Sequence, residues 1–181
     1  MARSKLWVFV LGLMVVIGAF SVFTVEQWQK AILFQLGKVV SSDYKAGLQL
    51  KVPVIQNVEK FDARLQTLES EPELYLTSEK KNVLVDSFVL WRIKNVESFY
   101  TATGGSIARA GARLGEFVRK GLKDEFGKRT IQEVVSGKRA DIMDILTVTA
   151  NAQAEPFGIE IVDVRVKRID LPTEVSTSVY Q

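Results

Sequence analysis

The 181-residue sequence contains neither cysteine nor histidine. Thiolate nucleophiles, zinc fingers, Ser-His-Asp triads and the usual His-ligated zinc and haem sites therefore cannot be built from it. A chain without thiols is compatible with either side of a membrane, so the missing cysteine does not fix the redox compartment. We expect no catalytic residues, no metal and no cofactor in this protein.

A strong excess of one charge is also missing. The net charge is +3, and Arg3 and Lys5 supply two of these charges ahead of a long apolar run. The rest of the chain holds 22 basic and 21 acidic side chains, with the two signs interleaved. Nucleic-acid-binding proteins cluster their basic residues, and no zinc-knuckle spacing or aromatic RNA-binding motif is present. The sequence therefore argues against nucleic acid as a partner.

Charge is absent altogether from one long segment. Twenty consecutive residues, from Leu6 to Val25, carry no charged side chain. A helix of that length spans about 30 Å, the thickness of the hydrocarbon core of a bilayer. An export signal has a shorter apolar run and a small-residue cleavage site, for which Ala19-Phe20-Ser21 is only a weak candidate. The sequence predicts an uncleaved transmembrane helix over residues 6–25.

The charges that flank this segment predict its orientation. Arg3 and Lys5 lie on the N-terminal side, whereas Glu26 opens the other side and Lys30 is its first base. Positive flanks stay in the cytoplasm, so residues 1–5 are expected inside and the rest outside. In a Gram-negative bacterium this places a single-pass protein in the inner membrane with a periplasmic head domain.

Residues 26–93 show the alternation of apolar and polar side chains that is typical of β-strands. The runs AILFQLG (31–37), GLQLKVPV (47–54) and KFDARLQTLE (60–69) are three examples. In the second run the apolar side chains that share one face are Leu48, Leu50, Val52 and Val54. The longest run places on one face Val83, Val85, Val89, Trp91 and Ile93. We expect a β-rich subdomain over residues 26–93.

The pattern becomes mainly helical over residues 94–171. VESFYTATGG (96–105) predicts a short helix that ends in glycines, and Ser106 is expected to cap a helix from Ile107 to Gly127. A capping-box pair, Thr130 and Glu133, precedes further helix, including a third helix over 139–156. A last strand follows, with three valines predicted to face inward: Val162, Val164 and Val166. Pro172 starts another helix, of which residues 172–181 are the beginning. The expected fold class is α+β.

The S-x-x-K spacing of Ser-Lys hydrolases occurs at Ser42–Lys45 and Ser78–Lys81. Enzymes that use this spacing place it at a helix start and add S-D-N and K-T-G elements, which are absent here. Chance explains both occurrences, although a membrane-bound Ser-Lys hydrolase remains the alternative from another functional class.

Two further features have simple structural explanations. Gly104-Gly105-Ser106 could bind an anion at a helix start, but it lacks the phosphate-loop and dinucleotide-binding frames, and a glycine C-cap followed by a serine N-cap accounts for it. The carboxylates of Asp141 and Asp144 lie three residues apart on a helix and are expected to face solvent. The basic face of the helix that begins at Ile107 could touch anionic lipid, but interleaved acidic residues indicate a solvated face.

Several segments together resemble one family. The sequence is similar to the stomatin, prohibitin, flotillin and HflK-HflC (SPFH) proteins, and within them to the bacterial HflC branch. The segments that carry this resemblance are FDARLQTLE (61–69), KKNVLVDSFVLWRI (80–93), FYTATGG (99–105), IQEVVSGKRADIM (131–143) and FGIEIVDVRVKRIDLPTEVSTSVY (157–180). The resemblance covers essentially all of residues 1–181.

The resemblance implies a non-enzymatic scaffold in a hetero-oligomer. HflC-like proteins pair with a sister subunit, HflK, and their assembly encloses and regulates FtsH, a membrane-bound ATP-dependent metalloprotease. Members of the family continue into long helices beyond the position of Gln181, so the anchor and head are expected here without the main assembly element. A lipid-organising scaffold of the stomatin type, with no protease partner and no small-molecule substrate, is the alternative within the family.

Overall fold

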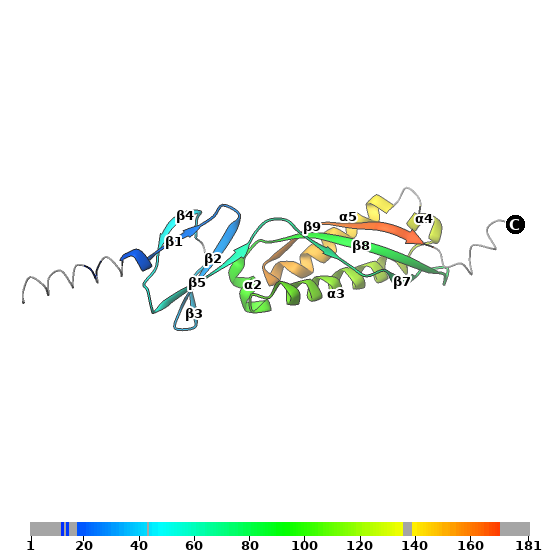
Figure 1. Ribbon diagram of the computed structural model, residues 1–181. Coiled ribbons are helices and arrows are strands. Elements are labelled where there is room, and N and C mark those ends of the chain that lie inside the picture. Colours follow the sequence, from blue (N-terminus) through cyan, green and yellow to red (C-terminus); the bar gives the residue numbers. More distant parts are fainter. Residues whose placement is uncertain (1–11, 13, 15–17, 43, 136–138, 171–181) are drawn as a thin grey trace, which may run out of the picture. The chain divides into compact units, whose positions relative to one another are not determined.

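The computed structural model describes residues 12, 14, 18–42, 44–135 and 139–170. The chain forms two compact units, an N-terminal unit, Met1–Arg64, and a C-terminal unit, Leu65–Gln181 (Figure 1). The expected boundary lay between residues 93 and 94. The division falls earlier because the strands that follow Leu65 pair with each other and with the last strand of the chain. The expected segments 1–5 and 172–181 lie outside the described residues.

The N-terminal unit contains two small antiparallel sheets. Strands β1 (Val22–Val25) and β4 (Gly47–Leu50) form a two-stranded ribbon. Strands β3 (Lys38–Ser41), β2 (Gln29–Gln35) and β5 (Gln56–Asp62) form the second sheet, with β2 in the centre. Four consecutive residues of β2, Ala31 to Phe34, are buried, so both faces of this strand are covered at that point. The buried core residues of this unit are Val25, Ala31, Ile32, Leu33, Phe34 and Phe61.

Strand β1 corrects the expected end of the transmembrane segment. Residues 22–25 were predicted to complete a membrane-spanning helix, but they pair with β4 in the register Val22 to Leu50 and Val25 to Gly47. An uncharged run does not by itself distinguish helix from strand. Within the described part of the chain, no helix is long and apolar enough to cross a bilayer. Most of the predicted helix, residues 6–11, 13 and 15–17, lies outside that part.

Two other strand predictions in this region were too long. The strand expected over 47–54 ends at Leu50, and the one expected over 60–69 is divided between β5 and β6 (Gln66–Glu69). The break follows Asp62, whose carboxylate accepts hydrogen bonds from the backbone N–H of Arg64 at 2.9 Å and from its guanidinium. Such side-chain bonds to nearby backbone favour turns over continued strands.

The C-terminal unit is an antiparallel sheet covered on one face by helices (Figure 1). The long strand β8 (Asn82–Ile93) pairs on one side with β6 and β7 (Glu73–Leu76) and on the other with β9 (Ile159–Asp170). The helices are α2 (Val96–Thr103), α3 (Ile107–Phe126), α4 (Ile131–Val135) and α5 (Arg139–Ala154), followed by the 3-10 helix η1 (Glu155–Phe157). The predicted face of β8 is confirmed, because all five of its large apolar residues are buried.

Strand β9 contains two β-bulges. Asp163 pairs with Leu90, and Ile161 pairs with Trp91. Val162, which lies between them, therefore has no partner opposite it on β8. The extra residue reverses which side chains face the core, because side chains alternate along a strand. Val162 is therefore 45% exposed and Ile161 is buried, so the predicted inward position of Val162 was wrong, while those of Val164 and Val166 are confirmed.

The predicted caps at Gly104, Ser106 and Thr130 are confirmed, whereas the helix expected over 139–156 ends at Ala154 and is followed by the 3-10 helix η1. Ser106 accepts a hydrogen bond from the backbone N–H of Arg109, and Gly104 ends α2 in the left-handed conformation. In the capping box, the backbone N–H of Thr130 donates to Glu133 at 3.1 Å and that of Glu133 donates to the Thr130 hydroxyl at 3.4 Å. These bonds satisfy backbone donors that a helix start leaves free.

Gly158 connects the helices to β9 at a crowded point. Its φ is +69°, and its carbonyl accepts hydrogen bonds from the backbone N–H groups of Lys94 and Asn95 at 2.9 and 3.0 Å. A Cβ added here would collide with the carbonyl oxygen of Asn95 and lie 2.6 Å from the backbone nitrogen of Phe99. Both are backbone atoms, so neither can move aside without shifting the start of α2.

The ionisation of Glu125 makes the stability of the C-terminal unit depend on pH. Its carboxylate accepts hydrogen bonds from Lys128 at 3.1 Å and Arg129 at 3.4 Å. The hydrogen bond from Lys128 is the main cause that lowers the pKa of Glu125 below its ordinary value of 4.5. Because the folded pKa is the lower one, this contribution is complete above about pH 4.5 and is lost as the pH falls through the folded pKa.

We expect Glu125→Gln to lose less stability than the wild type when the pH is lowered from about 6 to about 3. The measurement is urea unfolding of the detergent-solubilised full chain with Trp7 and Trp28 replaced by phenylalanine, so that the fluorescence reports on the buried Trp91. Asp144→Asn, at an exposed carboxylate, is the control and should keep the wild-type acid dependence. If Glu125→Gln and the wild type lose the same free energy of unfolding as the pH is lowered, Glu125 is not the cause of the acid dependence.

Candidate functional site

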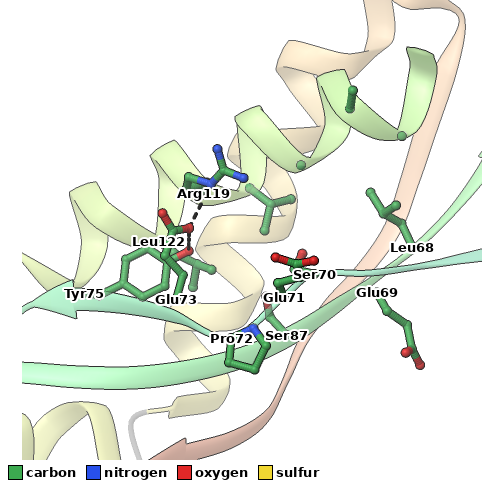
Figure 2. A pocket seen from close by; sticks show the side chains of 14 residues that line it. Leu68, Glu69, Ser70, Glu71, Pro72, Glu73, Tyr75, Ser87, Arg119 and Leu122 are labelled. Carbon is green, nitrogen blue, oxygen red and sulfur yellow. Dashed lines mark hydrogen bonds and ion pairs between the residues drawn. The ribbon is translucent and has the colours of Figure 1, made fainter. Parts of the chain in front are cut away.

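A groove lies between α3 and the chain that joins β6 to β7 (Figure 2). Its volume is about 550 Å³, within the range of about 300–1,000 Å³ that is usual for ligand sites. We call it the α3 groove, and its lining includes Ser70, Glu71, Ser87, Gly111, Ala112 and Gly115. All of its lining residues belong to the C-terminal unit.

The α3 groove exists because small residues occupy one stretch of α3. Leu114, Val118 and Leu122 are buried, whereas Gly111 and Gly115 present no side chain to the sheet. A Cβ on Gly115 would meet nothing within 4 Å, and one on Gly111 would lie 3.3 Å from Leu68. Opposite these glycines the edge of the sheet is interrupted, since no strand covers the residues between Glu69 and Glu73.

Three glutamates line the α3 groove, and two of them have partners. Glu69 forms an ion pair with Lys167 at 3.0 Å, and Glu73 forms one with Arg119 at 2.8 Å. The hydroxyl of Tyr75 also donates to Glu73, at 3.1 Å. Burial and the nearby Glu73 carboxylate raise the pKa of Tyr75 above its usual range, so its hydroxyl stays protonated and remains a hydrogen-bond donor.

The residues singled out for chemistry do not form a reaction centre. Ser78 lies in the turn before β8, where its backbone N–H donates to the carbonyl of Arg129 at 3.0 Å. Lys81 pairs with Glu79 at 3.8 Å, and no hydrogen bond joins its amine to the Ser78 hydroxyl. In the other S-x-x-K pair, Lys45 is exposed.

The remaining candidates have structural roles or are solvent-exposed. Gly104 and Ser106 are helix caps, and Asp141 and Asp144 are both exposed on α5. No group of three or more acidic side chains that could hold a metal ion occurs among the described residues.

The N-terminal unit exposes a continuous set of apolar side chains, which the sequence did not predict. In the β1–β4 ribbon the register pairs Val22 with Leu50 and Thr24 with Leu48, so these four side chains share one face. We call it the ribbon face. Leu48 and Leu50 are 75% and 74% exposed, respectively. Leu48 and Leu50 share one face as predicted, and the structure shows that this face is exposed.

The loop after β4 extends this apolar surface. Val52 and Ile55 are exposed, and Val54 is fully exposed with a φ of +76°. A β-branched residue with positive φ is an outlier that needs support from its surroundings. Exposed apolar patches of this kind mark membrane or protein contact sites more often than ordinary surface.

Comparison with known proteins identifies the family. The profile of the SPFH domain / Band 7 family matches residues 23–181, beginning inside strand β1. This chain belongs to the SPFH family. The resemblance predicted from the sequence is therefore confirmed, and with it the SPFH head of mixed strands and helices. A match that begins at residue 23 is also consistent with β1 being part of the SPFH domain.

Several curated SPFH proteins are similar to this chain over most of its length. Protein HflC of Haemophilus influenzae is 40% identical, with 89% of this chain and 58% of the relative covered. Modulator of FtsH protease HflC of Escherichia coli K12 is 33% identical, covering 88% and 62%, respectively. Protein HflC of Vibrio parahaemolyticus is 31% identical, covering 98% and 66%. The chain thus spans about three fifths of the length of these relatives.

Proposed function

We propose that this SPFH protein is a non-enzymatic, membrane-anchored scaffold subunit that pairs with the sister subunit HflK and modulates the protease FtsH. The observation that carries the proposal is the similarity to the modulator of FtsH protease HflC, which extends over 88% of this chain. The folded SPFH units supply a binding scaffold, and the absence of histidine and cysteine from the sequence supports a role without catalysis.

The proposed anchor is the apolar segment that precedes β1. Because residues 22–25 are a strand, the segment is reduced to about residues 6–21, somewhat shorter than the roughly 20 residues that usually span a bilayer. Lys5 can extend its side chain toward the interface, and the ribbon face can enter the same interfacial layer. The apolar ribbon thereby compensates for the short helix.

The proposed orientation follows from charge. Arg3 and Lys5 keep the N-terminus in the cytoplasm, which directs both compact units to the periplasmic side of a bacterial inner membrane. The ribbon face then lies against the outer leaflet of that membrane. This arrangement sets the height at which the head meets neighbouring subunits.

Affinity purification tests this proposal. A tagged full chain, expressed with full-length HflK and extracted in mild detergent, is expected to recover HflK and FtsH. The control variant is Gly158→Ala, which disrupts the C-terminal unit but leaves residues 1–64 unchanged. It should remain in the membrane and lose both partners. If the intact chain recovers neither HflK nor FtsH, the scaffold proposal is wrong.

A lipid-organising role without a protease partner is the second candidate. The exposed ribbon face favours it, because this surface offers apolar contact area that needs no protein. The same purification separates the two roles. Recovery of the intact chain with membrane lipid, but without FtsH or HflK, would support the lipid-organising role.

A further inference from the structure

Ser87 is a buried residue whose hydroxyl forms no hydrogen bond with another described residue. Its Oγ is not fully enclosed, since among the described residues only Arg129 Nε is an enclosed side-chain polar atom without a partner. It is only 2% exposed, on the helix-covered face of β8, and it lines the α3 groove (Figure 2). Two other buried polar side chains behave differently. The Thr77 hydroxyl donates to the carbonyl of Lys81 at 3.0 Å, and that of Thr103 donates to Phe99 at 2.6 Å. Because the Ser87 hydroxyl is not fully enclosed and lines the groove, a group that enters the groove can form a hydrogen bond with it.

The rim of the α3 groove carries one negative charge that nothing compensates. Lys167 pairs with Glu69 and Arg119 pairs with Glu73, but no ion pair or hydrogen bond involves the Glu71 side chain in the described structure. Glu71 is exposed and belongs to the segment that crosses the mouth of the groove (Figure 2). A carboxylate in this position favours a cationic group on the ligand.

The backbone beside the α3 groove is suited to an extended peptide. β6 and β7 pair only with β8 among the strands that the structure describes, so their outer side is a sheet edge. In the segment between β6 and β7, the backbone N–H of Ser70 donates a hydrogen bond to the carbonyl of Ser87 at 3.0 Å. Exposed sheet edges bind extended chains through main-chain hydrogen bonds. On the opposite wall, Gly115 leaves room for another backbone to approach α3, whereas Leu68 already packs closely against Gly111.

We propose that the α3 groove binds an extended polypeptide segment that carries a lysine or arginine side chain. The cationic side chain forms an ion pair with Glu71. The main chain of the segment passes Gly115 of α3 and forms a hydrogen bond with the Ser87 hydroxyl. The proposal specifies the bound segment only by its extended main chain and its basic side chain. The inference is independent of the proposed function, because it requires neither the membrane anchor nor FtsH.

Peptide selection provides the test. Randomised seven-residue peptides displayed on phage are selected against the immobilised full chain in a non-ionic detergent. Enriched peptides are synthesised with a fluorescent label, and their Kd is measured by anisotropy. We expect the enriched peptides to contain lysine or arginine. If no peptide is enriched, or if the enriched peptides lack a basic residue, the proposal is wrong.

Two alanines one turn apart on α3 provide a matched steric comparison. Ala112 lines the α3 groove, whereas Ala108 is exposed and does not. Ala112→Leu should fill the groove and abolish detectable peptide binding, while Ala108→Leu should bind like the wild type. Equal binding by these two variants would place the peptide elsewhere and overturn the proposal.

Two polar substitutions test the roles assigned to Glu71 and Ser87. Glu71→Gln should raise the Kd about three- to fivefold at low salt, and the difference should vanish near 1 M salt, where charges are screened beyond about 3 Å. Ser87→Ala should weaken binding while leaving the melting temperature unchanged, because the Ser87 hydroxyl forms no hydrogen bond with another described residue. A lower melting temperature with unchanged Kd would give Ser87 a structural role and overturn its assignment.

The same variants identify a different occupant. If no peptide binds, but Ala112→Leu changes the oligomeric state of the chain and Ala108→Leu does not, the α3 groove is occupied by a second copy of this protein. That result would overturn the basic-peptide proposal.

Discussion

Gly158→Ala is expected to destabilise the C-terminal unit by about 2–5 kcal/mol. The left-handed φ of +69° contributes about 1–2 kcal/mol of that loss for a residue with a side chain. The forced shift of backbone around Asn95 and Phe99 contributes about 1–3 kcal/mol or more, as overpacking does in protein cores. Small domains have only about 5–15 kcal/mol of stability in total, so this one methyl group should unfold a large fraction of the unit.

Urea unfolding measures this loss, in the same Trp7→Phe, Trp28→Phe full chain, followed through Trp91 fluorescence. Gly104→Ala is the matched control, because Gly104 has a similar φ of +59° but its close neighbour is the guanidinium of Arg109, at 2.7 Å. A flexible side chain can move away, so the control should lose only about 1–2 kcal/mol, the conformational part of the effect. Equal losses for the two variants would show that crowding at Gly158 is not the cause.

Replacing Gly12 and Gly18 together by arginine is expected to abolish membrane integration. An arginine near the centre of a membrane helix opposes insertion by about 2.5–3.5 kcal/mol, and less near its end. A Cβ at either position meets no atom within 4 Å, so charge rather than crowding should cause the effect. The measurement is resistance of the full chain to alkaline carbonate extraction, which releases peripheral proteins.

The control for this experiment replaces the same two glycines by leucine. That variant adds side-chain volume without charge and should resist extraction as the wild type does. Because the ribbon face can hold the protein at the surface peripherally, association at neutral pH is not informative. If the arginine variant still resists carbonate extraction, residues 6–21 are not the anchor.

The sequence predicted best those elements whose pattern is local and long. The long β-type run from Val83 to Ile93 predicted β8, and the five apolar residues that share one face of it predicted its buried face. α3 was equally clear, since Ser106 marks its start and its apolar residues recur at helical spacing. The capping box at Thr130 was also predictable, because both of its bonds lie within four residues.

The incorrect predictions depended on partners that are distant in the chain. Val162 faces solvent because of a bulge, which becomes visible only when β9 is set in register with β8. Residues 22–25 are a strand because β4 pairs with them, although their composition suits a helix in a membrane. The exposed ribbon face follows from this same pairing.

The α3 groove could not have been predicted from the sequence as a site. Its walls come from segments about forty residues apart, and its volume depends on how closely α3 approaches the sheet. The only local signal is the pair Gly111 and Gly115 on one side of an otherwise well-filled helix. That signal also fits close helix packing, so only the folded structure distinguishes an open groove from a contact.

The pairing of β8 determines how the C-terminal unit would respond to tension. The chain enters this unit where Gln66 pairs with Trp91 and leaves β9 where Asp170 pairs with Leu84. β6 and β9 are both antiparallel to β8, so a pull on the two ends draws these outer strands in opposite directions along it. Hydrogen bonds between antiparallel strands lie across the strands, so such a pull loads them together in shear instead of opening them one at a time. The C-terminal unit is thus built as a stiff mechanical link between whatever precedes Gln66 and whatever follows Asp170.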